Sequence, residues 1–243
     1  MAIAGMATLL LSSSTAVSSA AAPRSATVAA VSPAPGDVVG VAAPVTVSFA
    51  GPVRARDTVE RSISFASDSA RLTPAGTFTW LRDDTVQWTP TDFWPAHSTI
   101  SVLAGGFSTS FETGASVVGV ADIDAHTFTV SIDGQVAREM PASMGKRGFA
   151  TPIGTFTALE KQDVVVMDSR TIGIPLSDPE GYKLTVYDAV RVTWGGVYVH
   201  GAPWSTGSQG YSNVSHGCIN LSPDNASWYF DTVRIGDPII VQA

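Results

Sequence analysis

The chain has 243 residues, and its 14 basic and 21 acidic side chains give a formal net charge of −7 at pH 7. This acidic balance argues against a nucleic-acid-binding protein and against a protein that binds an anionic membrane surface. Only 14% of the residues are charged, whereas Gly, Pro, Ser and Thr are abundant. The composition therefore favours a β-rich extracytoplasmic protein of one or two domains over a cytosolic helical one.

The first residues have the pattern of an export signal. Ile3–Leu11 is a short apolar run, and Ala20–Ala22 offers small residues for cleavage. The run is too short and too interrupted by serine to predict a transmembrane helix, so no transmembrane segment is expected after processing. No Lys or Arg precedes the run, so either the start of the leader lies upstream or the numbering begins inside it. We predict a signal peptide at 1–22 and an exported protein, periplasmic or associated with the cell wall.

Residues 23–30 are predicted to be a linker, and residues 31–113 a first β domain. Short segments in which apolar and polar residues alternate recur about every ten residues, at 45–49, 62–65, 77–80, 85–88, 99–103 and 107–111. This spacing predicts an immunoglobulin-like β-sandwich, in the sense of architecture only, because no pair of cysteines accompanies it. No cluster of candidate nucleophiles or bases lies in this domain, which fits a spacer or a wall-positioning module.

A junction at Thr113–Ser116 precedes the second domain, residues 114–243. Strands are predicted at 117–120, 126–132 and 135–140, with Asp133-Gly134 as a two-residue hairpin turn. Ser222 is predicted to cap a helix that runs to about Val233, followed by a closing strand at 239–241.

The segment 163–189 is the least strand-like part of this half, because it contains four helix- and strand-breaking residues, namely Gly173, Pro175, Pro179 and Gly181. The predicted fold class is mainly β: two β-sandwich domains, with one helix in the C-terminal half.

The candidate for chemistry is Cys218, the only cysteine, which lies in the stretch Val197–Leu221 together with His200 and His216. A free thiol titrates near ~8.5 and is mostly protonated at neutral pH, so it needs a base to act as a nucleophile. Gly217 precedes the cysteine, where a missing side chain lets a substrate carbonyl approach the backbone N–H groups. We favour a nucleophilic Cys–His pair.

Other interpretations of these residues remain open. A lone cysteine is often a small buried hydrophobic residue. Two histidines and a cysteine can also ligate zinc, although no carboxylate or C-x-x-C motif accompanies them here. Residues two apart in an extended segment face the same way, so spacing alone does not decide whether His200 or His216 is the base for Cys218.

The motif His200-Gly201 followed by Ser215–Asn220 (S-H-G-C-I-N) resembles the active-site signature of the L,D-transpeptidases, the YkuD-type enzymes that cross-link bacterial peptidoglycan. The mycobacterial branch is also similar at Met167-Asp168-Ser169, Gly181-Tyr182, His200–Trp204 and Ser222–Ala226. The resemblance covers about half of the chain, from near residue 118 to the end. It implies a YkuD-type β-sandwich catalytic domain after an immunoglobulin-like domain, with 163–189 as a lid over the groove.

The resemblance also implies roles for individual residues. The catalytic set is Cys218, His200, His216, Gly201 and Gly217, and the substrate-binding set is Tyr182, Met167, Trp204, Ser215 and Asn220. His200 would take the thiol proton while the backbone carbonyl of Gly201 fixes its other ring nitrogen, and His216 would be a supporting donor. The wider family usually has Arg where this chain has Asn220, so a cationic contact to a substrate carboxylate is not implied. No metal and no cofactor are implied.

The implied function is an acyltransferase that forms 3→3 cross-links from a tetrapeptide stem, with release of D-Ala, to the side-chain amine of a second stem. Its partners would be donor and acceptor stem peptides, and carbapenems would inhibit it. The main alternative is an L,D-carboxypeptidase, in which water resolves the same thioester. A papain-like wall hydrolase is disfavoured because its cysteine would normally precede its histidine and start a helix. A wall-binding module with a degenerate site is disfavoured by the intact Cys–His–His set.

Overall fold

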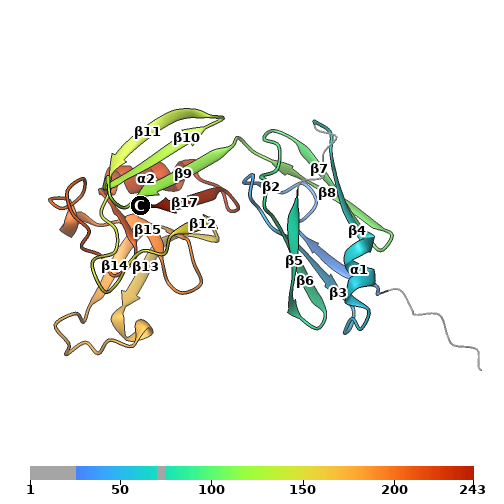
Figure 1. Ribbon diagram of the computed structural model, residues 1–243, viewed down its shortest axis with the longest axis horizontal. Helices are drawn as coiled ribbons and strands as arrows, with labels where there is room; N and C mark the ends of the chain where they lie inside the picture. Colours follow the sequence, from blue (N-terminus) through green and yellow to red (C-terminus); the bar gives the residue numbers. More distant parts are fainter. Residues whose placement is uncertain (1–25, 70–74) are drawn as a thin grey trace, which may run out of the picture.

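The computed structural model describes residues 26–69 and 75–243, and it shows two β domains joined end to end (Figure 1). The mainly β fold predicted from the sequence is confirmed. The predicted signal peptide lies outside the described residues. In the two described ranges, no helix is long and apolar enough to cross a bilayer.

The N-terminal domain is a sandwich of two four-stranded sheets, with strand orders β1-β3-β6-β5 and β2-β8-β7-β4. Strand β1 begins inside the range predicted to be a linker, because its residues pair with β3. A short helix, α1, was not predicted. The elements are β1 (Val28–Ser32), β2 (Val38–Val39), β3 (Val45–Phe49), α1 (Arg56–Ser62), β4 (Ile63–Ser67), β5 (Gly76–Arg82), β6 (Thr85–Pro90), β7 (Thr99–Ala104) and β8 (Phe107–Thr113).

Aromatic side chains fill the core of this domain. The period-2 alternation of β3 places Val45, Val47 and Phe49 inward, where all three are buried. The ring centroid of Trp88 lies 4.4 Å from that of Phe65 and 4.9 Å from that of Trp94. These rings fill the space between the two sheets, so the domain has its own hydrophobic core.

The C-terminal domain stacks a five-stranded sheet, β11-β10-β9-β17-β12, on a four-stranded sheet, β13-β14-β15-β16. Its strands are β9 (Val117–Asp122), β10 (Thr127–Ile132), β11 (Gln135–Pro141), β12 (Gly154–Thr157), β13 (Glu160–Asp168), β14 (Lys183–Arg191), β15 (Tyr198–Gly201), β16 (Ile219–Leu221) and β17 (Pro238–Gln242). Two 3-10 turns, η1 (Ser169–Ile172) and η2 (Pro203–Ser205), and the helix α2 (Pro223–Thr232) complete it. The predicted hairpin turn is confirmed, since Asp133 and Gly134 both have positive φ between β10 and β11.

The prediction that 163–189 is the least strand-like segment was wrong. Strands β13 and β14 pair at the two ends of that range, over about half of it, and only residues 169–182 between them lack strand structure. All four breaking residues fall inside this loop, whereas the flanks contain β-branched and aromatic residues such as Val164–Val166 and Tyr187, which favour strands. We call residues 169–182 the lid loop.

The helix prediction is confirmed. The Ser222 hydroxyl accepts a hydrogen bond from the backbone N–H of Asn225, and Pro223 occupies the first turn. Helix α2 ends at Thr232, and the chain turns at Gly236 into β17. The helix packs against β14 and β15, which places it behind the strand that carries His200.

The two domains meet through backbone hydrogen bonds. The N–H groups of Gly40 and Ala42 donate to the carbonyls of Ile235 (2.9 Å) and Gly236 (2.8 Å). A Cβ at position 40 would lie 2.0 Å from the backbone nitrogen of Asp237, so only glycine fits this approach. Asp237 is fully buried at this contact, and burial raises the pKa of its carboxyl to about 7.

Candidate active site

A parallel strand pair assembles the site. Strands β15 and β16 run side by side in the same direction, with His200 opposite Asn220. Paired residues point to the same face of a sheet, and side chains alternate along each strand. Cys218, two residues before Asn220, therefore shares a face with His200, and the long loop between the strands brings the two together.

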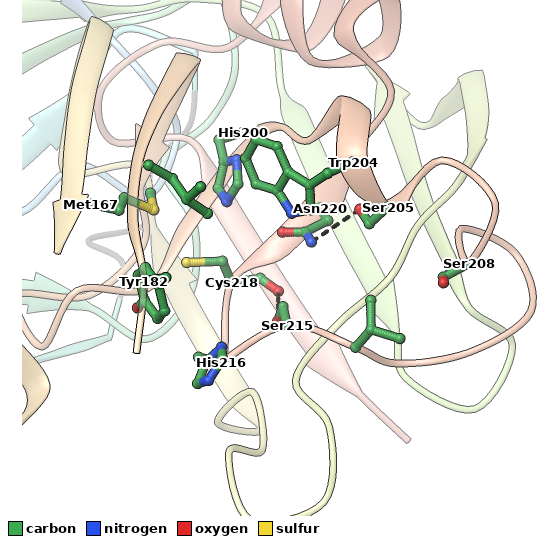
Figure 2. Close-up of a pocket in the computed structure, with 12 residues that line it drawn as sticks. Met167, Tyr182, His200, Trp204, Ser205, Ser208, Ser215, His216, Cys218 and Asn220 are labelled. Carbon is green, nitrogen blue, oxygen red and sulfur yellow. Dashed lines mark hydrogen bonds between the residues drawn. The ribbon is translucent and has the colours of Figure 1, made fainter. Parts of the chain in front are cut away.

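The side chains line a cavity of about 280 Å³. Figure 2 shows Cys218 with His200 on one side and His216 on the other. The structure thus brings all three chemically reactive side chains of the sequence motif into one pocket. Its lining is Met167, Tyr182, Leu184, His200, Trp204, Ser205, Ser208, Val214, Ser215, His216, Cys218 and Asn220.

His200 is held as a neutral imidazole. Its ring is only 2% exposed, and its Nδ1 lies 2.9 Å from the backbone oxygen of Gly201. A carbonyl only accepts, so Nδ1 carries the proton and the lone pair is left on Nε2. Burial lowers the pKa of His200 to about 4, so the imidazole is uncharged near neutral pH.

The thiol of Cys218 is protonated at rest. Burial raises its pKa to about 11, against the smaller lowering effect of the Tyr198 backbone. The sulfur lies 3.7 Å from the carbonyl oxygen of Gly196, in the turn between β14 and β15. An un-ionised thiol is a weak nucleophile, so nucleophilic attack by Cys218 would need a base to remove the proton.

Hydrogen bonds fix the backbone on both sides of the Gly217–Cys218 peptide. Gly217 has φ of +116°, which favours glycine, and its N–H donates to the Ser215 hydroxyl at 3.0 Å. The same hydroxyl donates to the Cys218 carbonyl at 2.7 Å, and Thr151 donates to the Gly217 carbonyl at 2.9 Å. The Ser215 hydroxyl is therefore occupied in shaping the loop that presents Cys218.

The remaining predicted substrate-binding residues surround the thiol. Asn220 is buried and donates to the Ser205 hydroxyl at 3.2 Å. Trp204 is half exposed, with its ring centroid 6.0 Å from that of His200. Met167 and Cys218 both pack against a small buried cluster formed by residues of β14 and β15. All of these side chains face the cavity from different elements.

His216 lies in an environment that the sequence did not reveal. Its ring is flanked by Phe149 and Tyr182, at centroid distances of 4.5 Å and 4.9 Å. Its Nε2 lies 2.9 Å from the Glu180 carboxylate, which also accepts a hydrogen bond from Lys146. Burial, followed by the nearby Cys218, raises the pKa of the Tyr182 phenol, so this hydroxyl stays protonated.

Sequence reasoning missed Glu180, Lys146, Phe149 and Gly196 at the site. The only signal for Glu180 was its position two residues before Tyr182 in a predicted lid. The other two histidines lie elsewhere: His97 contacts Asp133, and His126 contacts Asn213. In the part of the chain that the structure describes, no group of three His, Cys, Asp or Glu side chains is placed to hold a metal ion.

Comparison with known proteins identifies the family. Residues 116–241 match the L,D-transpeptidase catalytic domain (YkuD), and residues 7–105 match a bacterial Ig domain. The chain is 58% identical over 214 residues to L,D-transpeptidase 1 of Mycobacterium tuberculosis, a match that covers 88% of this chain and 84% of the relative. The chain therefore belongs to the L,D-transpeptidase family, and the resemblance read from the sequence motif is confirmed.

Solved structures of related proteins agree with the fold. An L,D-transpeptidase from Mycobacterium smegmatis is 71% identical, with a TM-score of 0.86 and coverage of 90% of this chain and 99% of that one. The structure of the L,D-transpeptidase LdtMt1 in complex with imipenem is 58% identical, with a TM-score of 0.82 and coverage of 89% and 99%. The similarity extends over both domains.

Proposed function

We propose that the chain is a peptidoglycan L,D-transpeptidase that uses Cys218 as a covalent nucleophile and forms 3→3 cross-links. The observation that carries this proposal is the placement of the only thiol in one pocket with His200, whose tautomer is fixed by the Gly201 carbonyl. The family membership supplies the reaction class, and the pocket supplies the residues that perform it.

In the first half-reaction, His200 Nε2 takes the thiol proton as the sulfur attacks the carbonyl of the third residue of a tetrapeptide stem. The carbonyl carbon becomes tetrahedral, and the C–N bond to the terminal D-Ala breaks. The imidazolium returns its proton to the departing amine, so D-Ala leaves and a thioester remains on Cys218. The backbone N–H of Cys218 and the protonated Tyr182 hydroxyl are the proposed donors to the oxyanion.

In the second half-reaction, the side-chain amine of another stem attacks the thioester, and the thiolate leaves. Met167, Trp204 and Asn220 line the groove in which the stems are proposed to lie. Gly217 allows a close approach to the backbone, because no side chain projects from it. Ser215 contributes by holding the loop that carries Cys218.

We also propose that carbapenems acylate Cys218, because a relative of high identity has been solved with imipenem. The enzyme would act outside the cytoplasm, in the periplasm or at the cell wall, where stem peptides are found. Its Ig domain, with no candidate catalytic cluster among its described residues, would position the catalytic domain on the wall.

The test is incubation of the protein with a disaccharide-tetrapeptide, followed by mass spectrometry of the products. We expect a dimer that has lost one D-Ala. Tripeptide alone would identify an L,D-carboxypeptidase, in which water replaces the amine. No change in the substrate would contradict both enzymatic functions. The matched control is Cys218→Ala, which keeps the fold and removes the nucleophile.

A further inference from the structure

The lid loop places a carboxylate beside the active site. Glu180 Oε2 lies 2.9 Å from His216 Nε2 and also accepts a hydrogen bond from Lys146 Nζ. The Asp178 side chain accepts the Glu180 N–H at 2.8 Å and so fixes the backbone that carries it. Lys146 first, and then His216, lower the pKa of Glu180, so the carboxyl is ionised. A charged carboxylate is therefore in direct contact with His216, a histidine of the pocket.

The contact determines which nitrogen of His216 is basic. An ionised carboxylate only accepts hydrogen bonds, so in the neutral imidazole Nε2 carries the proton and the lone pair lies on Nδ1. In the described part of the chain, Nδ1 has no hydrogen-bond partner. The side chain is 18% exposed and lines the pocket beside Cys218. A histidine oriented by a carboxylate in this way has the arrangement of a general base.

The two histidines of the pocket therefore differ in what orients them. A neutral backbone carbonyl holds His200, whereas a carboxylate holds His216. The reaction has two steps that release a proton: the attack by the thiol and the attack by the acceptor amine. The Gly201 carbonyl suits a base, His200, that stays neutral at rest. The Glu180 carboxylate stabilises an imidazolium while it forms on His216, because opposite charges attract in a partly desolvated site.

We propose that His216 is the general base of the second half-reaction, with Glu180 as its positioning residue. This inference rests on the proposed function. As the acceptor nitrogen bonds to the thioester carbon, its N–H proton moves to Nδ1 of His216, and the C–S bond breaks to release the Cys218 thiolate. The proton then returns to the sulfur, so one amide bond is formed, one thioester bond is broken, and the enzyme regains its starting state.

The surroundings of His216 fit this role. Phe149 and Tyr182 both pack against the ring, and these contacts restrict its rotation before the acceptor arrives. The charged groups facing it are the Glu180 carboxylate, with Lys146 on the same oxygen, while Tyr182 and Cys218 are neutral at rest.

The experiment separates the two half-reactions. Acylation is measured as D-Ala release in a single turnover of a disaccharide-tetrapeptide. Transfer is measured by adding an acceptor stem to the acyl-enzyme and following its decay by intact-mass spectrometry. Glu180→Gln keeps the shape of the side chain and removes its charge. We expect this variant to slow transfer about tenfold and to slow acylation by at most about twofold.

Three further variants test the assignment of roles. His216→Asn should lose about 10²-fold in transfer, the range of a positioned general base. Glu180→Asp restores the charge on a shorter side chain and should recover part of the loss. Glu139→Gln is the charge-matched control, because this exposed carboxylate of β11 forms no ion pair within the described residues; it should react like the wild type.

The opposing interpretation is that Glu180 only ties the lid to the rest of the domain. Lys146→Met tests it, because this change removes the ion pair between Lys146 and Glu180 and leaves the contact between Glu180 and His216. If Glu180→Gln and Lys146→Met slow acylation and transfer alike, Glu180 is a structural tie and the inference is overturned. Normal acylation with unimpaired transfer in His216→Asn would overturn it as well. A wild-type protein that never forms the acyl-enzyme would instead overturn the proposed function, and the inference with it.

Discussion

The two domains are both β-sandwiches, yet the candidate active site lies in only one of them. In the N-terminal domain, packed aromatic rings close the core, and β7 and β8 are joined by the tight turn at Gly105-Gly106. In the C-terminal domain, β15 and β16 are parallel, so a long loop must connect them, and the pocket opens along that loop. The difference shows that the layers support the site, whereas the connections between strands contain it.

Burial also changes the protonation of groups in the catalytic domain. In the pocket it lowers the pKa of His200 to about 4 and raises that of Cys218 to about 11. Displaced pKa values in a pocket are typical of a reactive site. Asp237 also has a raised pKa, but it is buried at the contact with the N-terminal domain and does not line the pocket.

The largest expected effect is the loss of all covalent chemistry in Cys218→Ala. We expect the wild type to form a stable one-to-one adduct with a carbapenem and only weak labelling with penicillins, because one thiol must carry the acyl group. Intact-mass spectrometry measures the adduct. Turnover of the tetrapeptide by a folded Cys218→Ala protein, or an adduct on it, would falsify the assignment of the nucleophile.

The next effect is that of His200→Ala, which should slow acylation about 10²-fold or more. Between pH 6 and 8, the wild-type rate should vary little, because the pKa of His200 is about 4 and that of Cys218 is about 11. Without the base, only free thiolate reacts, so the rate of the variant should rise about tenfold per pH unit. The pH profile of carbapenem acylation measures both. A flat profile in the variant would move the base assignment to His216.

A third effect concerns the stability of the domain contact. Asp237 keeps its proton up to about pH 7 in the folded protein, whereas its ordinary pKa is 3.8. Between these values ionisation favours the unfolded chain, so this contribution is fully present below about pH 4 and is lost as the pH rises to about 7. We expect Asp237→Asn to reduce the fall in melting temperature from pH 4.5 to 7. Equal falls in variant and wild type would show that Asp237 does not titrate this way.

The smallest expected effect on chemistry is that of removing the N-terminal domain. Each domain has its own hydrophobic core, and none of the described residues before 115 belongs to the core of the catalytic domain. A chain that starts at Gly114 should therefore be acylated by a carbapenem at a rate within about threefold of the full chain. It should melt at a lower temperature, because the contact at Ile235–Asp237 becomes exposed. Loss of acylation in a folded truncation would assign the sandwich a part in building the site.

Local signals in the sequence were enough to predict much of this protein. Alternation of apolar and polar residues gave the strands, because side chains on a strand point to opposite faces. Ser222 and Pro223 gave the start of α2, because capping depends on neighbours in the chain. The motif around Cys218 indicated the family, because Cys218 and His216 are close in sequence. Strands β13 and β14 were missed because the breaking residues of the loop between them dominated the interpretation of the whole segment.

Only the tertiary structure decided how the two histidines differ. The register of β15 and β16 places His200 beside the thiol and turns its Nδ1 to a backbone carbonyl. The lid loop brings Glu180 to His216 across a separation of 36 residues. Neither contact follows from spacing, because each depends on how distant segments pack. Burial then sets the pKa of each group, and burial is a property of the folded chain alone.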